Sequence, residues 1–173
     1  MLSAIHKAYK NPALKFIFSL LVLYFVWDTV YVVFLMNSKF SIVICDFLAN
    51  STSSVLSLFG VESAASHSWV YINGKRAIGI GTPCNGLDFI GLFTCFVLSF
   101  PAKWQSKSGF LPLGILLIFL LNLVRIQVLI INYYYFHSSF DFNHHYTFNF
   151  FIYGMMLIVW LAWAKKEMKH SYA

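Results

Sequence analysis

A cysteine stands where a strand-like stretch gives way to a long apolar run. The sequence there is GIGTPCNGLDF, with Pro83 directly before Cys84 and Asn85-Gly86 directly after it. The unpaired amides at the N-terminus of a helix favour a thiolate and lower the pKa of a cysteine placed there. We therefore expect Cys84 to begin the helix that follows and to act as a nucleophile.

Two further kinds of polar group lie in or beside apolar runs. Arg125 lies inside one run, and His144 and His145 stand just before another. An arginine inside a membrane segment costs about 2.5–3.5 kcal/mol on insertion scales, which favours a functional role over one that merely reaches the outer headgroups. The histidines are either interfacial polar residues or the base of a catalytic site. A thiolate, a proton-transferring imidazole and a cation that stabilises an oxyanion would together perform acyl transfer.

Four other residues have simpler interpretations. Cys45 and Cys95 lie in apolar surroundings and are expected to be small packing side chains. Asp28 lies within an apolar run and either pairs with the intramembrane arginine or lines the helix bundle. Asp88 stands four residues after the expected nucleophile and could orient a neighbouring group. The cysteine spacing matches no zinc or redox motif, so we expect no metal and no cofactor.

The composition indicates a membrane protein. Hydrophobic residues make up 60% of the 173-residue chain and charged residues 10%, whereas a soluble domain has about 25% charged residues. The net charge of +6 does not indicate a nucleic-acid partner, because the basic residues lie at the ends of apolar runs and form no stripe. We predict an all-α polytopic membrane protein whose residues 1–173 form one domain in the lipid bilayer.

About four apolar segments are expected to cross the bilayer, at 16–36, 84–101, 110–136 and 148–164. The second is short. Its apolar run, residues 87–100, would form a helix about 21 Å long, which is less than the thickness of a hydrocarbon core of about 30 Å. We interpret the first as a retained anchor, since no small-residue cleavage site follows it.

Lysine and arginine residues give these segments an orientation. Eight lie near one set of segment ends and three near the other. The larger set is Lys7, Lys10, Lys15, Lys103, Lys107, Lys165, Lys166 and Lys169, and the smaller set is Lys39, Lys75 and Arg76. The positive-inside rule therefore places both termini in the cytoplasm and the stretches 37–86 and 137–147 outside. Arg125 then lies about 22 Å along an outward-running helix, so thiol, guanidinium and imidazole are expected to share the outer leaflet.

The outer region 41–82 has its own predicted structure. Residues 41–59 carry apolar side chains at helical spacing with a Ser/Thr cluster between them, which indicates an interfacial amphipathic helix. Two strand-like stretches then flank Asn73-Gly74, the preferred dipeptide of a type I′ turn. We expect a small β-hairpin that leads into Cys84.

These motifs resemble those of the exosortase/archaeosortase family of membrane-embedded cysteine transpeptidases. The similar stretches are Pro83-Cys84-Asn85-Gly86-Leu87, Asn122-Leu123-Val124-Arg125-Ile126 and the His144 region before the last helix. The resemblance covers roughly residues 55–164 and is closest to the short forms of Bacteroidetes-type bacteria. Larger members have more spanning helices, so this chain corresponds to a compact catalytic core.

The resemblance implies a cysteine peptidase in the bacterial inner membrane with Cys84, Arg125 and His144 as catalytic residues, His145 being the second choice for the base. The implied substrates are exported proteins that end in a short motif, a transmembrane helix and a basic tail. Cleavage would occur at the outer face through a Cys84 thioester, which water or an acceptor would resolve.

Two other functions are compatible with the same residues. A non-enzymatic scaffold or assembly subunit would use the outer hairpin as a docking surface, but it would not explain a thiol, a guanidinium and an imidazole in one leaflet. A cysteine-dependent acyltransferase would use the same side chains on a different substrate. A channel or transporter is disfavoured, because the segments contain few polar groups that could line a path.

Overall fold

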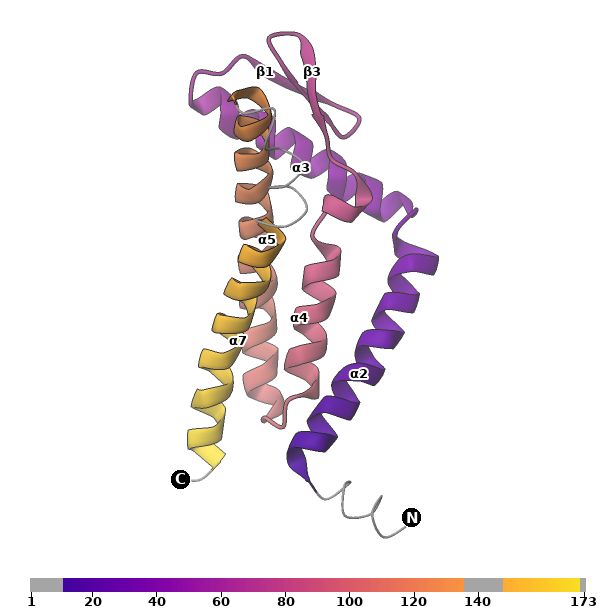
Figure 1. Ribbon diagram of the computed structural model, residues 1–173, viewed down its shortest axis with the longest axis vertical. Coiled ribbons are helices and arrows are strands. Elements are labelled where there is room, and N and C mark those ends of the chain that lie inside the picture. Colours follow the sequence, from indigo (N-terminus) through magenta and orange to yellow (C-terminus); the bar gives the residue numbers. More distant parts are fainter. Residues whose placement is uncertain (1–10, 136–147, 172–173) are drawn as a thin grey trace.

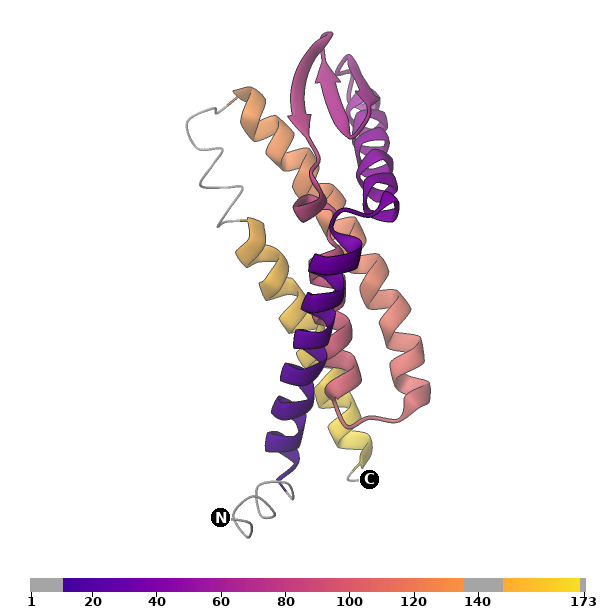
Figure 2. The same cartoon turned by 90° about the vertical axis from the view of Figure 1, so that its right-hand side faces the viewer.

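Most of the chain is helical, and its long helices run side by side. The computed structural model describes residues 11–135 and 148–171. Four helices lie along the long axis of the molecule: α2 (Pro12–Val30), α4 (Leu87–Ser99), α5 (Trp104–Tyr135) and α7 (Phe148–Ser171). A fifth helix, α3 (Lys39–Leu58), runs obliquely across their ends (Figure 1). The start of α2 and the end of α7 lie at the opposite end of the bundle from α3 (Figure 2).

The helices confirm a polytopic membrane protein. In the described part of the chain, three helices are long and apolar enough to cross a membrane, namely Pro12–Leu35, Lys39–Leu58 and Trp104–Tyr133. The apolar helix α4 is shorter. Because α3 lies across the other helices, its length and composition do not by themselves make it a spanning segment.

Helix α3 is the amphipathic helix that the sequence predicts. Its N-cap is Ser38, whose side chain accepts a hydrogen bond from the amide of Ser41 at 3.1 Å. One face is buried, and its members recur three or four positions apart. They are Ser41, Cys45, Leu48, Ala49, Thr52, Ser53 and Leu56. The opposite face leaves large apolar side chains such as Phe40 and Phe47 exposed.

The predicted hairpin is present and belongs to a three-stranded antiparallel sheet. Its strands are β1 (Ser63–Ser66), β2 (Trp69–Ile72) and β3 (Lys75–Gly79), in the order β1-β2-β3. Asn73 and Gly74 both have positive φ, at 50° and 72°, as a type I′ turn requires. The sequence did not predict β1, because its serine and alanine residues are small and it lacks the β-branched or aromatic side chains typical of strands.

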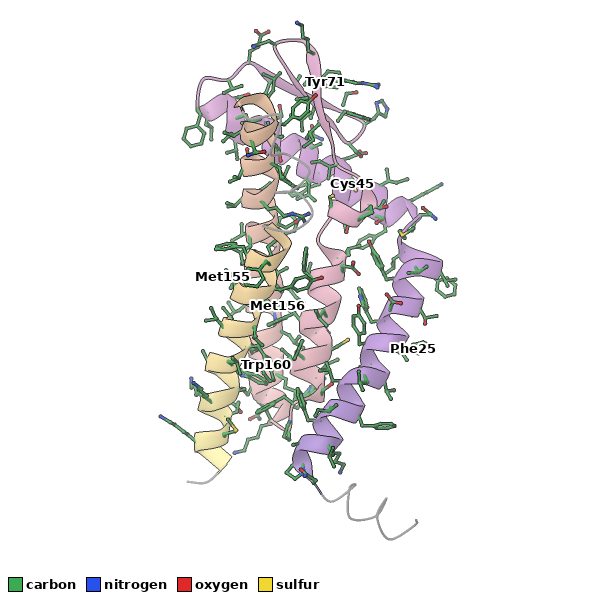
Figure 3. All side chains as sticks on the ribbon, in the orientation of Figure 1. Phe25, Cys45, Tyr71, Met155, Met156 and Trp160 are labelled. Atoms are coloured by element: carbon green, nitrogen blue, oxygen red, sulfur yellow. The ribbon has the colours of Figure 1, made fainter. Side chains whose placement is uncertain are left out.

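Two apolar clusters stabilise the molecule. The first joins the sheet, α3 and the end of α5, and consists of Cys45, Leu48, Ala49, Leu56, Val70, Ile72, Ile80, Ile126 and Ile130. The second joins α4, α5 and α7, and consists of Phe89, Phe93, Val97, Ile118, Ile152, Met156, Trp160, Trp163 and Ala164. Figure 3 shows Met156 and Trp160 directed into the bundle and Phe25 on the outer side of α2.

Helix α4 packs closely on both of its neighbours. A Cβ atom at Gly91 would lie 1.9 Å from the ring of Trp27 on α2, and one at Gly114 of α5 would lie 2.1 Å from the ring of Phe93. Glycine is therefore required at both contacts, where a side chain meets the backbone of the facing helix. This packing fixes α4, and with it the segment that contains Cys84, against α2 and α5.

Candidate active site

Cys84 lies on a short turn before α4 and not on α4 itself. Thr82–Cys84 form a single 3₁₀ turn, in which the amide of Cys84 donates to the carbonyl of Gly81 at 2.8 Å. Gly86 follows with φ of +83°, a left-handed conformation that ends the turn, and α4 begins at Leu87. The expectation that Cys84 begins the helix at residue 84 is therefore wrong, because the backbone changes direction between the cysteine and the helix.

The surroundings of the sulfur also differ from the expected ones. Burial raises the pKa of the Cys84 thiol, and the positive charge of Arg125 acts in the opposite direction. Among the causes that involve described residues, burial is the largest. The pKa is thus raised, and not lowered as expected of a cysteine at a helix N-terminus. A raised pKa favours the neutral thiol, so a nucleophilic role would need a base that takes its proton during attack.

This electrostatic balance predicts how Cys84 reacts with a thiol reagent. In a variant with Cys45→Ala and Cys95→Ala, the alkylation rate of Cys84 should increase with pH, with a midpoint above the ordinary cysteine range of about 8–9. The thiolate is the form that reacts with the reagent. A raised pKa means that the thiolate forms only at a higher pH, so the midpoint of the alkylation rate moves upward. The measurement is the labelling rate between pH 6 and 10 in membranes, and a midpoint below the ordinary range would contradict it.

Arg125 is buried on α5 beside the start of α4. Only 6% of its surface is exposed. Its Cζ atom lies 5.8 Å from the centre of the Phe89 ring, and its Nη1 donates to the side-chain oxygen of Asn122 at 3.5 Å. Its Nε has no acceptor among the described residues. The guanidinium therefore has donor capacity left for another group at this position.

Asn122 connects the arginine to the cysteine turn. Its side chain is fully buried, its Nδ2 donates to the carbonyl of Cys84 at 3.0 Å, and its Oδ1 accepts from Arg125. A Cβ atom at Gly86 would lie 3.1 Å from this amide, so glycine leaves room for it. Residues three apart share one face of a helix, which is why Asn122 and Arg125 point to the same place. Sequence reasoning included Asn122 in a motif without giving it a role.

Two other helices also hold the turn. Asn85, which is buried, donates through Nδ2 to the hydroxyl of Ser41 on α3 at 2.6 Å, and its Oδ1 accepts from the amide of Leu87 at 3.0 Å. The hydroxyl of Tyr31, at the end of α2, donates to the carbonyl of Thr82 at 3.2 Å. The turn is therefore hydrogen-bonded to α2, α3 and α5, and its position depends on all three.

A profile of the transmembrane exosortase family matches residues 10–162, which include the Cys84 turn, all of α4 and α5, and most of α7. The chain belongs to the transmembrane exosortase family. No curated protein and no solved structure matches this exosortase.

The exosortase brings together two of its three predicted catalytic residues. The backbone carbonyl of Cys84 and the guanidinium of Arg125 both contact the side chain of Asn122, a residue for which the sequence indicated no such role. His144 and His145 lie outside the described residues. Helix α7, which follows them, contributes Tyr153, whose ring centre lies 5.0 Å from that of Phe89 beside the arginine.

The two acidic residues considered in the apolar segments, Asp28 and Asp88, do not pair with Arg125. Asp28 on α2 and Asp88 on α4 are both exposed. Asp28, Asp88 and Arg125 all belong to the described residues, and no ion pair joins either carboxylate to the guanidinium. The pairing of Asp28 with Arg125, which the sequence left open, is therefore not formed. Within residues 11–135 and 148–171, no three His, Cys, Asp or Glu side chains are grouped so that they could hold a metal ion.

Replacing Asn122 should lower the expected activity without removing the candidate nucleophile. Asn122→Ala leaves the Cys84 carbonyl and Arg125 without their shared partner, and we expect an activity about 10- to 100-fold lower, as for the loss of one or two buried hydrogen bonds. The measurement is the rate of substrate processing in membranes. Gln127→Ala is the matched control, because Gln127 is another amide of α5 whose side chain contacts Thr52 rather than the turn. Equal rates in the two variants would contradict the prediction.

Proposed function

We propose that the chain is a membrane-embedded cysteine transpeptidase or protease that cleaves the C-terminal sorting signals of exported proteins. The observation that carries this proposal is the buried Arg125, which shares Asn122 with the Cys84 turn and whose Nε donor has no acceptor among the described residues. A buried guanidinium that no described carboxylate pairs is costly, and such costs are typical of functional sites in membranes. Membership of the exosortase family supports the same chemistry.

The reaction begins with attack by Cys84 on the scissile peptide carbonyl. As the S–C bond forms, the thiol proton passes to a histidine and the carbonyl oxygen becomes an oxyanion. The C–N bond then breaks, the leaving amine takes the proton from the imidazolium, and the helical tail of the substrate departs. The remaining acyl group is a thioester on Cys84. Water or an acceptor amine or hydroxyl attacks it, and the sulfur regains its proton.

Arg125 acts on the oxyanion or on the substrate carbonyl. A planar, permanently charged group in a buried position stabilises a developing negative charge far better than it would in water. Asn122 holds the guanidinium in place from one side. The same positive charge opposes the effect of burial on the Cys84 thiol, so a single side chain favours both the thiolate and the oxyanion.

His144 is the proposed base, with His145 as the second candidate. A base is needed because burial raises the pKa of the Cys84 thiol and so favours its neutral form. His144→Ala and His145→Ala should differ strongly in processing rate, the larger loss marking the base. Full activity in both variants would show that neither histidine takes the proton.

The proposed location is the bacterial inner membrane, with both termini in the cytoplasm and the Cys84 turn at the outer face. The distribution of lysine residues supports this orientation. The substrate would lie beside the enzyme in the bilayer, anchored by its own transmembrane helix and basic tail. Its cleavage motif would then be at the depth of the Cys84 turn.

Trapping the thioester tests this function directly. The probe is a reporter protein that ends in the motif, transmembrane helix and basic tail of a signal protein from the same organism. Membranes with the wild-type enzyme are quenched in acid, and the Cys84 peptide is analysed by mass spectrometry with and without hydroxylamine. We expect a hydroxylamine-sensitive adduct that contains the reporter's new C-terminal residue. A fatty-acyl adduct would indicate an acyltransferase, and the absence of any adduct alongside unprocessed reporter would favour a scaffold.

A further inference from the structure

Strand β3 is an edge strand that leads directly to the nucleophile. In the sheet order β1-β2-β3 it has one neighbour, β2, and its other edge is unpaired among the described residues. The strand ends at Gly79, and Cys84 follows five residues later. Figure 1 shows β3 descending into the short turn above α4. The unpaired edge therefore ends at the candidate active site.

Gly79 and Gly81 direct backbone groups toward this unpaired edge. The amide of Ile80 donates to the carbonyl of Ser68 at 2.8 Å, so Ile80 faces β2. In an extended strand, the N–H and C=O groups of successive residues point to opposite edges. The N–H and C=O of Gly79 and the N–H of Gly81 therefore point away from β2. No backbone group in the described ranges accepts from the amide of Gly81, which follows the end of the strand.

The contacts among the described residues do not explain why residue 81 is glycine. Gly81 has φ of −78° and ψ of 163°, which any residue can adopt. Of the described residues, a Cβ atom there would meet only Pro83, at an ordinary contact distance of 3.5 Å. Gly79 differs, because its Cβ would lie 3.0 Å from the ring of Trp69. Glycine in an extended strand often marks a place where another backbone approaches closely.

We infer that the edge of β3 and its continuation through Gly81 bind the substrate as an added strand. The occupant is the extended segment on the N-terminal side of the scissile bond, an inference that rests on the proposed function. Backbone pairing at an exposed sheet edge is a general mode of peptide recognition. The substrate chain runs from its exported domain toward the membrane. The enzyme chain runs the same way from Lys75, where β3 begins, to Cys84, so the two strands are parallel. Pairing would bring the scissile carbonyl to the sulfur.

A proline at residue 81 tests this pairing. The φ of Gly81 suits proline, and its N–H has no acceptor among the described residues, so Gly81→Pro removes the outward donor while keeping the fold. We expect reporter processing to fall at least about tenfold, as for a lost hydrogen bond in a bound substrate, with unchanged alkylation of Cys84. Gly81→Ala retains the N–H and should lose less. Ala64→Val, on the exposed opposite edge strand β1, should process at the wild-type rate.

Proline substitutions in the reporter give an independent test. Each of the residues before the scissile bond is replaced in turn, and a paired strand should lose processing at alternate positions, because every second N–H points to β3. Wild-type processing by Gly81→Pro, or equal tolerance of proline at all reporter positions, would overturn the inference. If Cys84→Ala still processes the reporter, the proposed function itself fails. Cys84-dependent processing that is insensitive to these prolines would instead refute only the added strand.

Discussion

Replacing Cys84 with alanine is expected to abolish cleavage of the sorting-signal reporter. Alanine cannot form the thioester, and none of the described side chains bonded to the turn can replace the sulfur as nucleophile. Asn85, Asn122 and Tyr31 bond to backbone atoms or to other side chains around the turn, so the fold of the variant should be retained. The measurement is the conversion of full-length reporter to its shortened form in membranes over time.

A matched variant separates this loss from a general effect of removing a cysteine. Cys95 is buried on α4, and Cys95→Ala should process the reporter at close to the wild-type rate. Cys84→Ser is expected to be nearly as inactive as Cys84→Ala, because a hydroxyl is a much weaker nucleophile without a dedicated base for it. Processing by Cys84→Ala at an appreciable rate would remove Cys84 from the mechanism.

Replacing Arg125 with lysine is expected to reduce processing about 100- to 1,000-fold, a loss comparable to that of one oxyanion donor. Lysine keeps the charge but loses the planar arrangement of donors, so it cannot bind Asn122 and the oxyanion together. The two effects of Arg125 can therefore be distinguished. The alkylation midpoint of Cys84 should change little in Arg125→Lys, whereas Arg125→Gln should raise it because the opposing charge is gone.

The combination of these two variants is decisive for the role of Arg125. Near-normal processing in Arg125→Lys would limit the arginine to a general electrostatic effect or to a contact with headgroups. An unchanged alkylation midpoint in Arg125→Gln would show that the arginine does not act on the thiol. Both variants keep a polar side chain at a buried position, and their thermal stability in detergent should be compared with that of the wild type before the rates are interpreted.

The approach of Cys84 and Arg125 could be predicted from the sequence because it depends on topology. Apolar runs of known length and the positions of the lysines predict a common depth for both residues, whatever the details of packing. The hairpin was predictable for a local reason, since Asn73-Gly74 favours the turn that the structure contains. The amphipathic helix was predictable from its periodicity, which matches the buried face of α3.

The local geometry of the turn could not be predicted in the same way. Pro83 suits the first turn of an α-helix and a 3₁₀ turn equally well, so it does not distinguish between them. Gly86 was the residue from which the break could have been predicted. A glycine before an apolar run can adopt the left-handed conformation that separates a turn from a helix, as Gly86 does. The role of Asn122 needs the distance between two helices, which a sequence alone does not contain.

The oblique course of α3 has a consequence for where peptide bonds can be cut. Exposed large apolar side chains such as Phe40, Val43 and Phe47 would resist removal of this helix from lipid, which favours a constant height relative to the bilayer surface. Since Asn85 bonds to Ser41 on the same helix, the sulfur is held at a fixed vertical distance from it. A change in bilayer thickness would then alter only the positions of the opposite ends of α2, α5 and α7. The peptide bond chosen by the proposed enzyme would depend on its distance from the surface at which α3 lies, and not on the thickness of the bilayer.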